Sequence, residues 1–527
     1  MLERVQLLGS KKDPERQFKV VGFSLFLLFA AICYWSMPSL AYQEWDSLVY
    51  AHAVENDPLP LGWGNHPLGN LIQSFTYRVA LFLGYDGRAL ILLQIFNTLA
   101  SAASIAVFYV ILVRRIEINI IPAVGWSAFF GSGYSMLSFA GTAEIYSIAL
   151  LLLLIAWNSL LFALNRPEFS RLIIAGLLIG LAGLSHQFSA ILLAAGVLAA
   201  CFYQTRRTIV LLGGTIFSIL LIGYGLLGYL DTGSFALDGL YAWIKGYVGE
   251  PSYGRSLTLE GMQLAMTSGT QSLIKSAVAG LSPVRILVLG IIVFIFIALP
   301  FQRRLWTSRN IKIVIYCSVP ALIGLPLIIW WDPVLEGKFW LLIAPFFIAL
   351  LTLSLPSNKR WTRFIPVSLA VLTLLVNQLN GLRYEHMPDR VFEASLQAWI
   401  DHSSRGDVLY ESNNYTAHLL YWGDRPRTIS AGELFYGNDD LNNPYRPLER
   451  VIEDAWARGA SVLYTEGLND YLDDDRLAVV GASREGINAF FRSYRHEGPV
   501  FEYREYSEGP MKQVFRLVPL VSQQVGQ

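Results

Sequence analysis

The chain has 527 residues, of which 54% are apolar and only 15% are charged, whereas soluble proteins carry about 25% charged residues. Its 40 Lys and Arg residues balance its 40 Asp and Glu residues, so the charge gives no indication of a nucleic-acid partner. The three cysteines lie in apolar stretches and indicate neither a disulfide framework nor a metal site. This composition predicts an integral membrane protein.

Apolar runs of the length that a membrane-spanning helix needs, about 20 residues, recur through the first three-quarters of the chain. The first run lacks a signal-peptide cleavage pattern and is therefore predicted to be an uncleaved anchor. Single spans are predicted near 20–36, 89–112, 119–139, 143–164, 208–230, 284–301, 311–330, 339–355 and 362–379. A further apolar stretch, 172–203, is too long for one crossing.

Lys and Arg residues in the short loops predict the orientation, because cytoplasmic loops are enriched in them. Basic residues at 166–171 and 206–207 flank the stretch 172–203, which must then be a hairpin of two helices that turns at 183–186 on the outer side. Basic residues at 114–115, 303–312 and 359–363 mark further cytoplasmic loops. About eleven membrane helices result, with a cytoplasmic N-terminus and with residues 38–87, 231–282 and 384–527 outside.

Residues 384–527 are richer in charged residues, Asn and Tyr than the apolar part of the chain. Strand-like runs at 407–410 and 461–464 alternate there with helical patterns at 394–400 and 448–458. The predicted fold class is therefore an all-α polytopic membrane domain at 1–383 followed by an extracytoplasmic α/β domain at 384–527.

Two carboxylates, Glu44 and Asp46, follow the first predicted helix at the membrane surface. A carboxylate in this place can take a proton from a hydroxyl acceptor, and partial burial would make it a better base near neutral pH. The two-residue spacing also suits a divalent cation such as Mg²⁺ or Mn²⁺, which prefers carboxylate oxygens. The alternative interpretation is a solvated loop.

An amphipathic helix is predicted after His66-Pro67, with apolar residues at 68, 71, 72, 75 and 79, lying along the membrane interface. The pattern Asp46-x-x-x-Tyr50-Ala51 followed by His66-Pro67-Leu68 resembles the first outer loop of the C-type (GT-C) membrane glycosyltransferases. It looks most like the branch that contains protein O-mannosyltransferases and the aminoarabinose transferases of lipid A. Residues 143–147 and the Gly- and Leu-rich run 176–186 continue the likeness, which covers roughly the first 210 residues well and the rest in topology only.

The resemblance implies a polyprenyl-phosphate-sugar-dependent glycosyltransferase of the cell envelope, in the bacterial inner (plasma) membrane. The donor would be a sugar on a polyprenyl phosphate or diphosphate, displaced with inversion onto a lipid, glycan or protein acceptor at the outer face. On this likeness Asp46 is the base. The role of Glu44 stays open between acceptor binding, a shared cation site and tuning of the pKa of Asp46.

Other candidate donor-binding residues are predicted to reach the same outer face: Tyr50, His66, Glu144, His186, Glu336 and Lys338. The relatives often carry a Glu at the position of Glu144, a cationic residue at that of His186, and a Lys or Arg at that of Lys338. A protonated His186 would counter the charge of a phosphate, and Lys338 would bind it as a point charge. Structural alternatives are a Glu that caps a helix, a buried His and a snorkelling Lys.

Three other functions compete with transfer. A transporter or flippase of lipid-linked saccharides should carry charges or broken helices near the bilayer midplane, whereas the ionisable residues here gather near the outer surface. A polysaccharide polymerase or ligase of another membrane fold would use Arg and His rather than an acidic pair. A receptor or scaffold would not need so many helices.

Overall fold

The computed structural model describes residues 14–39, 43, 45–57, 59–60, 64, 66–245, 259–275, 308–331, 337–355, 363–382, 389–411, 415–425, 428–430, 443–465, 482–504 and 511–519. Three predictions lie outside these residues: the span at 284–301 and the candidate residues Glu44 and Glu336. The chain divides into two compact units. Unit 1 comprises residues 1–38, 57–246 and 255–386, and unit 2 comprises residues 39–56, 247–254 and 387–527.

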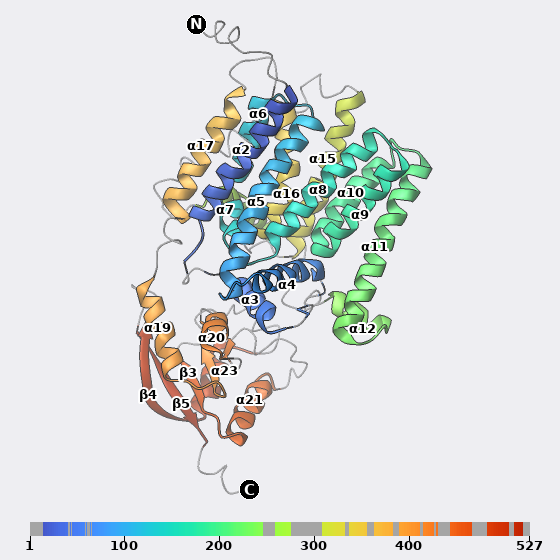
Figure 1. The fold of residues 1–527 in the computed structure, drawn as a ribbon. Coiled ribbons are helices and arrows are strands. Elements are labelled where there is room, and N and C mark those ends of the chain that lie inside the picture. The colour runs from blue at the N-terminus through green and yellow to red at the C-terminus, as the bar shows by residue number, and fades with distance from the viewer. Residues whose placement is uncertain are drawn as a thin grey trace. The chain divides into compact units, whose positions relative to one another are not determined.

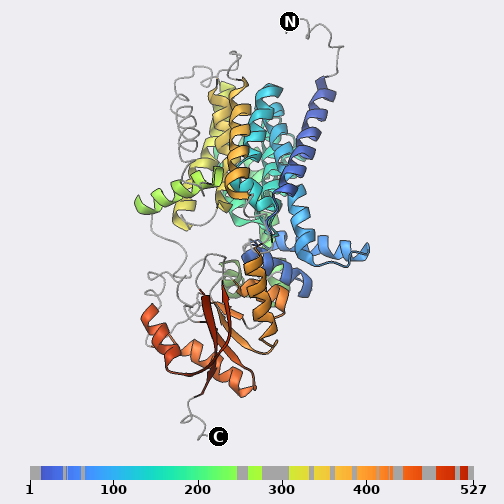
Figure 2. The ribbon, with the colours of Figure 1, turned by 90° about the vertical axis from the view of Figure 1, so that its left-hand side faces the viewer.

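Unit 1 is helical in its described residues, and helices that are close in sequence run side by side in it (Figures 1 and 2). Five of its described helices, α2, α5, α8, α11 and α15, are long and apolar enough to cross a membrane, and five shorter ones are apolar. The elements are α2 (Pro14–Trp35), α4 (Pro67–Phe82), α5 (Ala89–Arg114), α6 (Ile120–Gly131), α7 (Tyr134–Ala140), α8 (Tyr146–Asn165), α9 (Phe169–Ser185), α10 (Gln187–Ala200), α11 (Arg206–Thr232), α12 (Leu237–Lys245), α13 (Leu259–Leu273), α15 (Ser308–Trp331), α16 (Lys338–Ser354), α17 (Ile365–Asn377) and the π-helix η6 (Gln378–Leu382).

The predicted hairpin within 172–203 is present as α9 and α10, which meet at His186. His186 has an extended backbone, so the helical hydrogen bonding stops there. The predicted span at 119–139 is instead divided into α6 and α7 at Ser132 and Gly133. At this break the side-chain amide of Asn377 donates to the Ser132 carbonyl (2.8 Å), which gives the interrupted backbone a partner.

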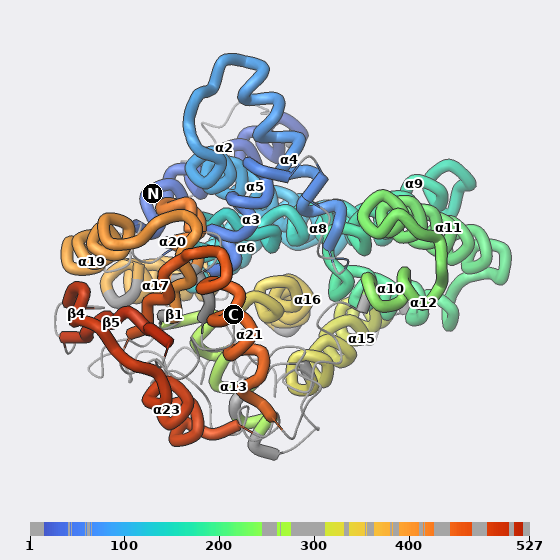
Figure 3. The backbone as a smooth tube through the Cα atoms, turned by 90° about the horizontal axis from the view of Figure 1, so that it is seen from below, coloured from blue at the N-terminus to red at the C-terminus, as the bar shows by residue number. Residues whose placement is uncertain are grey.

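Small residues bring α9 and α11 close together, and Figures 1 and 3 place these helices beside each other. A Cβ at Gly176 would lie 2.7 Å from the Thr215 Cβ, and one at Gly180 would lie 2.4 Å from the Ile219 Cγ2. Glycines four residues apart let helix backbones approach in membranes. The Gly- and Leu-rich run noted in the sequence therefore serves this packing.

The interfacial helix predicted after His66-Pro67 is α4, which lies across the direction of α5 and α8 (Figure 1). Its polar and small residues Gly69, Asn70 and Gln73 are buried, while the apolar Phe75 and Val79 are exposed. This polarity is the reverse of that of a helix on a water-soluble protein. An exposed apolar face is what a helix lying in the membrane interface presents to lipid.

Unit 2 contains a five-stranded sheet in its described residues, with the strand order β2-β1-β3-β5-β4. β1 pairs in parallel with β2 and β3, whereas β5 is antiparallel to both β3 and β4. The elements are α3 (Trp45–Asn56), α19 (Arg390–Asp401), β1 (Val408–Glu411), α20 (Thr416–Gly423), β2 (Thr428–Ser430), α21 (Arg446–Ala457), β3 (Val462–Thr465), α23 (Arg484–Arg492), β4 (Arg495–Arg504) and β5 (Met511–Val518). α3, from the first predicted outer loop, thus belongs with the C-terminal residues.

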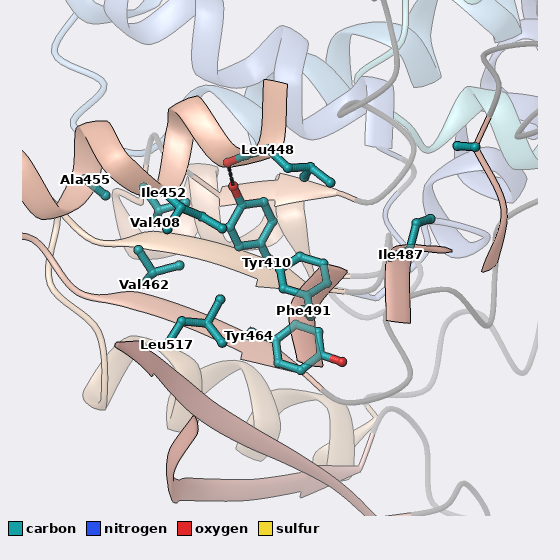
Figure 4. Packing of buried hydrophobic residues seen from close by; sticks show 11 residues of the cluster. Val408, Tyr410, Leu448, Ile452, Ala455, Val462, Tyr464, Ile487, Phe491 and Leu517 are labelled. Carbon is teal, nitrogen blue, oxygen red and sulfur yellow. Dashed lines mark hydrogen bonds between the residues drawn. The ribbon is translucent and has the colours of Figure 1, made fainter. Parts of the chain in front are cut away.

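The sheet has a hydrophobic core on each face, because its central strands alternate side chains between the two faces. One core joins Tyr410 and Tyr464 to α21 and α23 and includes Ile452 and Phe491 (Figure 4). The other joins β1 and β3 to α19 and α20. Its buried members are Phe392, Leu396, Trp399, Leu409, Tyr415, Leu419, Leu463, Phe501, Tyr503 and Val514. Unit 2 is therefore a three-layer α/β sandwich.

Candidate active site

Residues at the N-termini of four described helices of unit 1 meet in one cluster. His66 and His186 are the N-caps of α4 and α10, Tyr146 begins α8, and Phe339 lies in the first turn of α16. The ring centroid of His186 lies 6.1 Å from that of His66, 5.1 Å from that of Tyr146 and 5.9 Å from that of Phe339. Helix N-termini carry partial positive charge and unsatisfied N–H groups. The convergence of these helix N-termini therefore favours the binding of an anion.

A buried ion pair lies in this cluster. The Lys338 Nζ, at the start of α16, is 3.2 Å from the Glu144 Oε2, just before α8. The Glu144 side chain is fully buried and that of Lys338 is 12% exposed. The ammonium group also lies 5.7 Å from the ring centroid of Tyr146 and 6.0 Å from that of Phe139. An incoming anion would compete with Glu144 for a cation that is already in place.

The two histidines of the cluster are neutral. Burial lowers the pKa of His66 to about 3 and outweighs the hydrogen bonds with its own backbone and with Asn70, which raise it. The nearby charge of Lys338 is the smallest effect and also lowers this pKa. The Nδ1 of His186 accepts a hydrogen bond from the backbone N–H of Phe188 (3.1 Å), so this nitrogen carries no proton. A neutral His186 does not supply the positive charge that we predicted for it, whereas the Lys338 ammonium group brings a positive charge to the same cluster.

The segment 140–144, which presents Glu144, is held by side chains of two helices. Thr98 donates to the carbonyl of residue 140, Gln94 to that of residue 141, and Asn97 to those of residues 142 and 144, over 2.5–3.1 Å. Gln73 of α4 donates to the carbonyl of residue 143 (2.6 Å). Five consecutive carbonyl groups thus have side-chain donors, which fixes the backbone that carries Glu144.

The polar side chains of α5 were not among the predicted site residues, although the sequence carries a signal for them. Gln94, Asn97, Thr98 and Ser101 are spaced as one face of a helix inside an otherwise apolar run. All four are buried. Polar residues within a membrane helix usually face other helices and hydrogen-bond there. The carbonyl groups that these side chains bind could not be predicted from the sequence, because they lie some 40 residues further along the chain.

Two further predicted site residues, Asp46 and Tyr50, belong to unit 2. Asp46 lies in the first turn of α3 and is partly buried, and Tyr50, one turn later, is buried. The structure thus brings together Glu144, His66, His186 and Lys338 in unit 1. It assigns Asp46 and Tyr50 to the helix that folds with the C-terminal residues.

The predicted cation site consists of Glu44 and Asp46, and Glu44 is outside the described residues. Within the described part of the chain, no three His, Cys, Asp or Glu side chains are grouped so that they could hold a metal ion. The partner of the carboxylate in the candidate site is an amino group, that of Lys338.

Solved structures with the same fold are known, although their sequences are distant. ArnT from Cupriavidus metallidurans in the apo state matches with a TM-score of 0.58 and 9% identity, covering 96% of this chain and 98% of that one. The same protein bound to undecaprenyl phosphate matches with a TM-score of 0.55 and 10% identity over the same shares of the two chains. The Archaeoglobus fulgidus oligosaccharyltransferase tethered with an acceptor peptide matches with a TM-score of 0.51 and 12% identity, covering 95% and 74%.

No family model and no curated protein sequence matches this chain. The structural matches therefore carry the comparison, and at these identities they establish the fold. ArnT, an aminoarabinose transferase, and the oligosaccharyltransferase are both GT-C membrane glycosyltransferases. This chain is an integral membrane protein with the GT-C fold that its sequence predicted.

Proposed function

We propose that this protein is a membrane glycosyltransferase that transfers a sugar from a polyprenyl-phosphate-linked donor to an acceptor on the outer face of the membrane. The observation that carries the proposal is the convergence of four helix N-termini on the Glu144–Lys338 pair in a chain with the GT-C fold. Helix N-termini together with a lysine form a site for a phosphate group. ArnT, which has this fold, has been solved with undecaprenyl phosphate bound.

In the proposed reaction the phosphate of the donor binds at Lys338, with Glu144 holding the ammonium group in place before the donor arrives. The low pKa of His66 keeps its imidazole uncharged at neutral pH, so it and His186 contribute hydrogen bonding and ring surface rather than charge. Tyr146 and Phe339 offer aromatic faces next to the lysine. Aromatic surfaces suit a sugar ring or a prenyl chain.

Asp46 is proposed as the base. It takes the proton of the acceptor hydroxyl while the hydroxyl oxygen attacks the anomeric carbon of the sugar. The bond from that carbon to the phosphate oxygen breaks, and polyprenyl phosphate leaves with the bonding electrons. Attack opposite the leaving group inverts the anomeric configuration. A positioned base contributes about 10²- to 10⁴-fold to such a rate.

Release of polyprenyl phosphate from a panel of polyprenyl-phosphate sugars, with lipid, glycan and peptide acceptors, tests the proposal on purified protein in nanodiscs. We expect Asp46→Asn to lower the rate by about 10²-fold or more. Asp57→Asn is the matched control, because it changes a second carboxylate after the first helix and keeps the oxygen that accepts from the Leu59 N–H. Equal rates in wild type and Asp46→Asn would contradict the role of Asp46.

Two further arms of the same assay separate the alternatives. Movement of intact donor across the bilayer without release of polyprenyl phosphate would identify a flippase instead. Removal of divalent cations with EDTA, followed by addition of Mg²⁺ or Mn²⁺, tests the predicted cation site of Glu44 and Asp46. Loss and recovery of activity would support that site.

A further inference from the structure

The helix that carries Asp46 is too short to be stable by itself. α3 has 12 residues, and isolated helices shorter than about 12–15 residues are marginal in water. Three of its apolar residues, Leu48, Ala51 and Val54, are spaced on one face and are buried. α3 therefore depends on packing partners.

Those partners within unit 2 come from the C-terminal part of the chain. α3 packs against α20, and the Tyr421 hydroxyl donates a hydrogen bond to the Glu55 Oε1 in the last turn of α3 (2.7 Å). The two residues are 366 positions apart. The Tyr421 side chain is almost fully buried, and hydrogen bonds to a charged acceptor are roughly twice as strong as neutral ones.

A second contact lies before the start of α3. The imidazole of His418, which is also part of α20 and is buried, hydrogen-bonds with the backbone of Gln43. α20 in turn packs on α19 and contributes Leu419 to the second core of the sheet. Gln43 and the last turn of α3 are therefore both attached to a helix that is fixed by the core of the C-terminal domain.

From these contacts we propose that the C-terminal domain positions the helix that carries Asp46, through Tyr421 and His418 of α20. The structural part of this proposal stands on the contacts within unit 2 alone. Its consequence for catalysis rests on the proposed function, in which Asp46 is the base. Tyr421 and Glu55 are positioning residues, since they act on the reaction only through α3.

Hydrogen–deuterium exchange of the full-length protein in nanodiscs tests the structural part. We expect Tyr421→Phe and Glu55→Ala, which break the same hydrogen bond from opposite sides, each to speed the exchange of the α3 amides by about tenfold or more. Glu55→Gln keeps an acceptor oxygen and should restore most of the protection. Tyr410→Phe is the matched control, since this buried tyrosine bonds to the Leu448 carbonyl on the other face of the sheet.

Two outcomes would overturn the proposal. One is wild-type exchange of the α3 amides in both Tyr421→Phe and Glu55→Ala. The other is equally fast exchange in Tyr410→Phe, which would indicate general loosening of the domain. Neither result depends on enzymatic activity, so the proposal can fail while the proposed function stands.

Kinetics test the catalytic consequence. We expect Tyr421→Phe to lower kcat about tenfold with little change in the KM for the donor, because the base is displaced while Lys338 is untouched. Glu55→Gln should retain most of the wild-type kcat. If Asp46→Asn is fully active but the α3 amides respond as expected, the proposed base is wrong and the positioning contact remains.

Discussion

A carboxylate withdrawn from water, such as that of Glu144, is costly unless a cation compensates its charge. The Lys338 ammonium group provides that cation and is itself the proposed phosphate ligand. The pair therefore has a role in stability and a proposed role in donor binding. Single and double substitutions can separate these roles.

We expect Glu144→Gln and Lys338→Met each to lower the free energy of unfolding by about 3–5 kcal/mol, because each leaves a buried charge without its partner. The double variant should recover most of this loss but not donor binding, which needs the lysine. Thermal unfolding in detergent and binding of a polyprenyl phosphate would measure the two effects. Glu168→Gln breaks the more exposed pair with Arg171 and should cost less than about 1 kcal/mol. Strictly additive losses in the double variant would contradict the coupling.

His418 gives unit 2 a dependence on pH. Burial lowers its pKa to about 3, although the hydrogen bond with Gln43 opposes this, whereas the unfolded chain has a histidine pKa of about 6.5. Between these two pKa values, His418 binds a proton in the unfolded state but not in the folded state. The contribution of His418 to the free energy of unfolding is therefore fully present above about pH 6.5. It falls as the pH is lowered toward 3, by up to about 1.4 kcal/mol per pH unit.

Denaturant unfolding of unit 2 within the full chain, followed from pH 7 to 4, would measure this dependence. His418→Gln should reduce the change in the free energy of unfolding with pH. His402→Gln, which changes an exposed histidine of the same unit, should leave that change as in wild type. An unchanged slope in His418→Gln would mean that another group is responsible.

The sequence predicted which site residues of unit 1 lie close together, because the predicted topology placed Glu144, His66, His186 and Lys338 at one side of the membrane. It did not predict how they are held. The carbonyl groups of 140–144 are bound by side chains of α4 and α5, and such long-range partners leave no trace in local sequence periodicity. The sequence likewise did not predict the hydrogen bond from the Phe188 N–H to the Nδ1 of His186.

Among the helices, the close approach of α9 and α11 is the contact that a single methyl group can test. Gly180→Ala should lower the free energy of unfolding by about 1–3 kcal/mol, because its Cβ would fall 2.4 Å from Ile219. Gly225→Ala is the matched control on α11, where a Cβ meets nothing within 4 Å. That change should be neutral or slightly stabilising. Melting temperatures of the two variants in detergent test this difference. Equal melting temperatures for Gly180→Ala and Gly225→Ala would indicate that α9 and α11 can move apart at little cost.

Elements that show in the sequence as long apolar runs were predicted closely. α5, α8, α11 and α15 lie within a few residues of the predicted spans, and α4 and the α9–α10 hairpin are present as expected. The break between α6 and α7 was missed because no charged or strongly polar residue interrupts the apolar run there. The pair β4–β5 was missed because the first half of β4 is exposed on both faces and lacks alternation.

For the whole molecule, the orientation in the membrane is the main prediction still to be tested. In a background without Cys33 and Cys317, Ser430→Cys should react with an impermeant maleimide added outside intact cells. The natural Cys201, which is exposed next to the basic residues 206–207, should react only after the membrane is opened. It thus provides an internal control for the cytoplasmic side. The reverse labelling pattern would overturn the predicted orientation.

The long sequence separation between α3 and α20 has a consequence for biosynthesis. Glu55 leaves the ribosome 366 residues before Tyr421, which at about 5–20 residues per second is a delay of roughly 20–70 s. During that interval the helix bearing Asp46 has been made but its supporting domain has not. A nascent or truncated chain would thus insert its membrane helices while Asp46, the proposed base, is still not held in place. On the proposed function, transfer would then begin only after the C-terminal domain has been made and has folded.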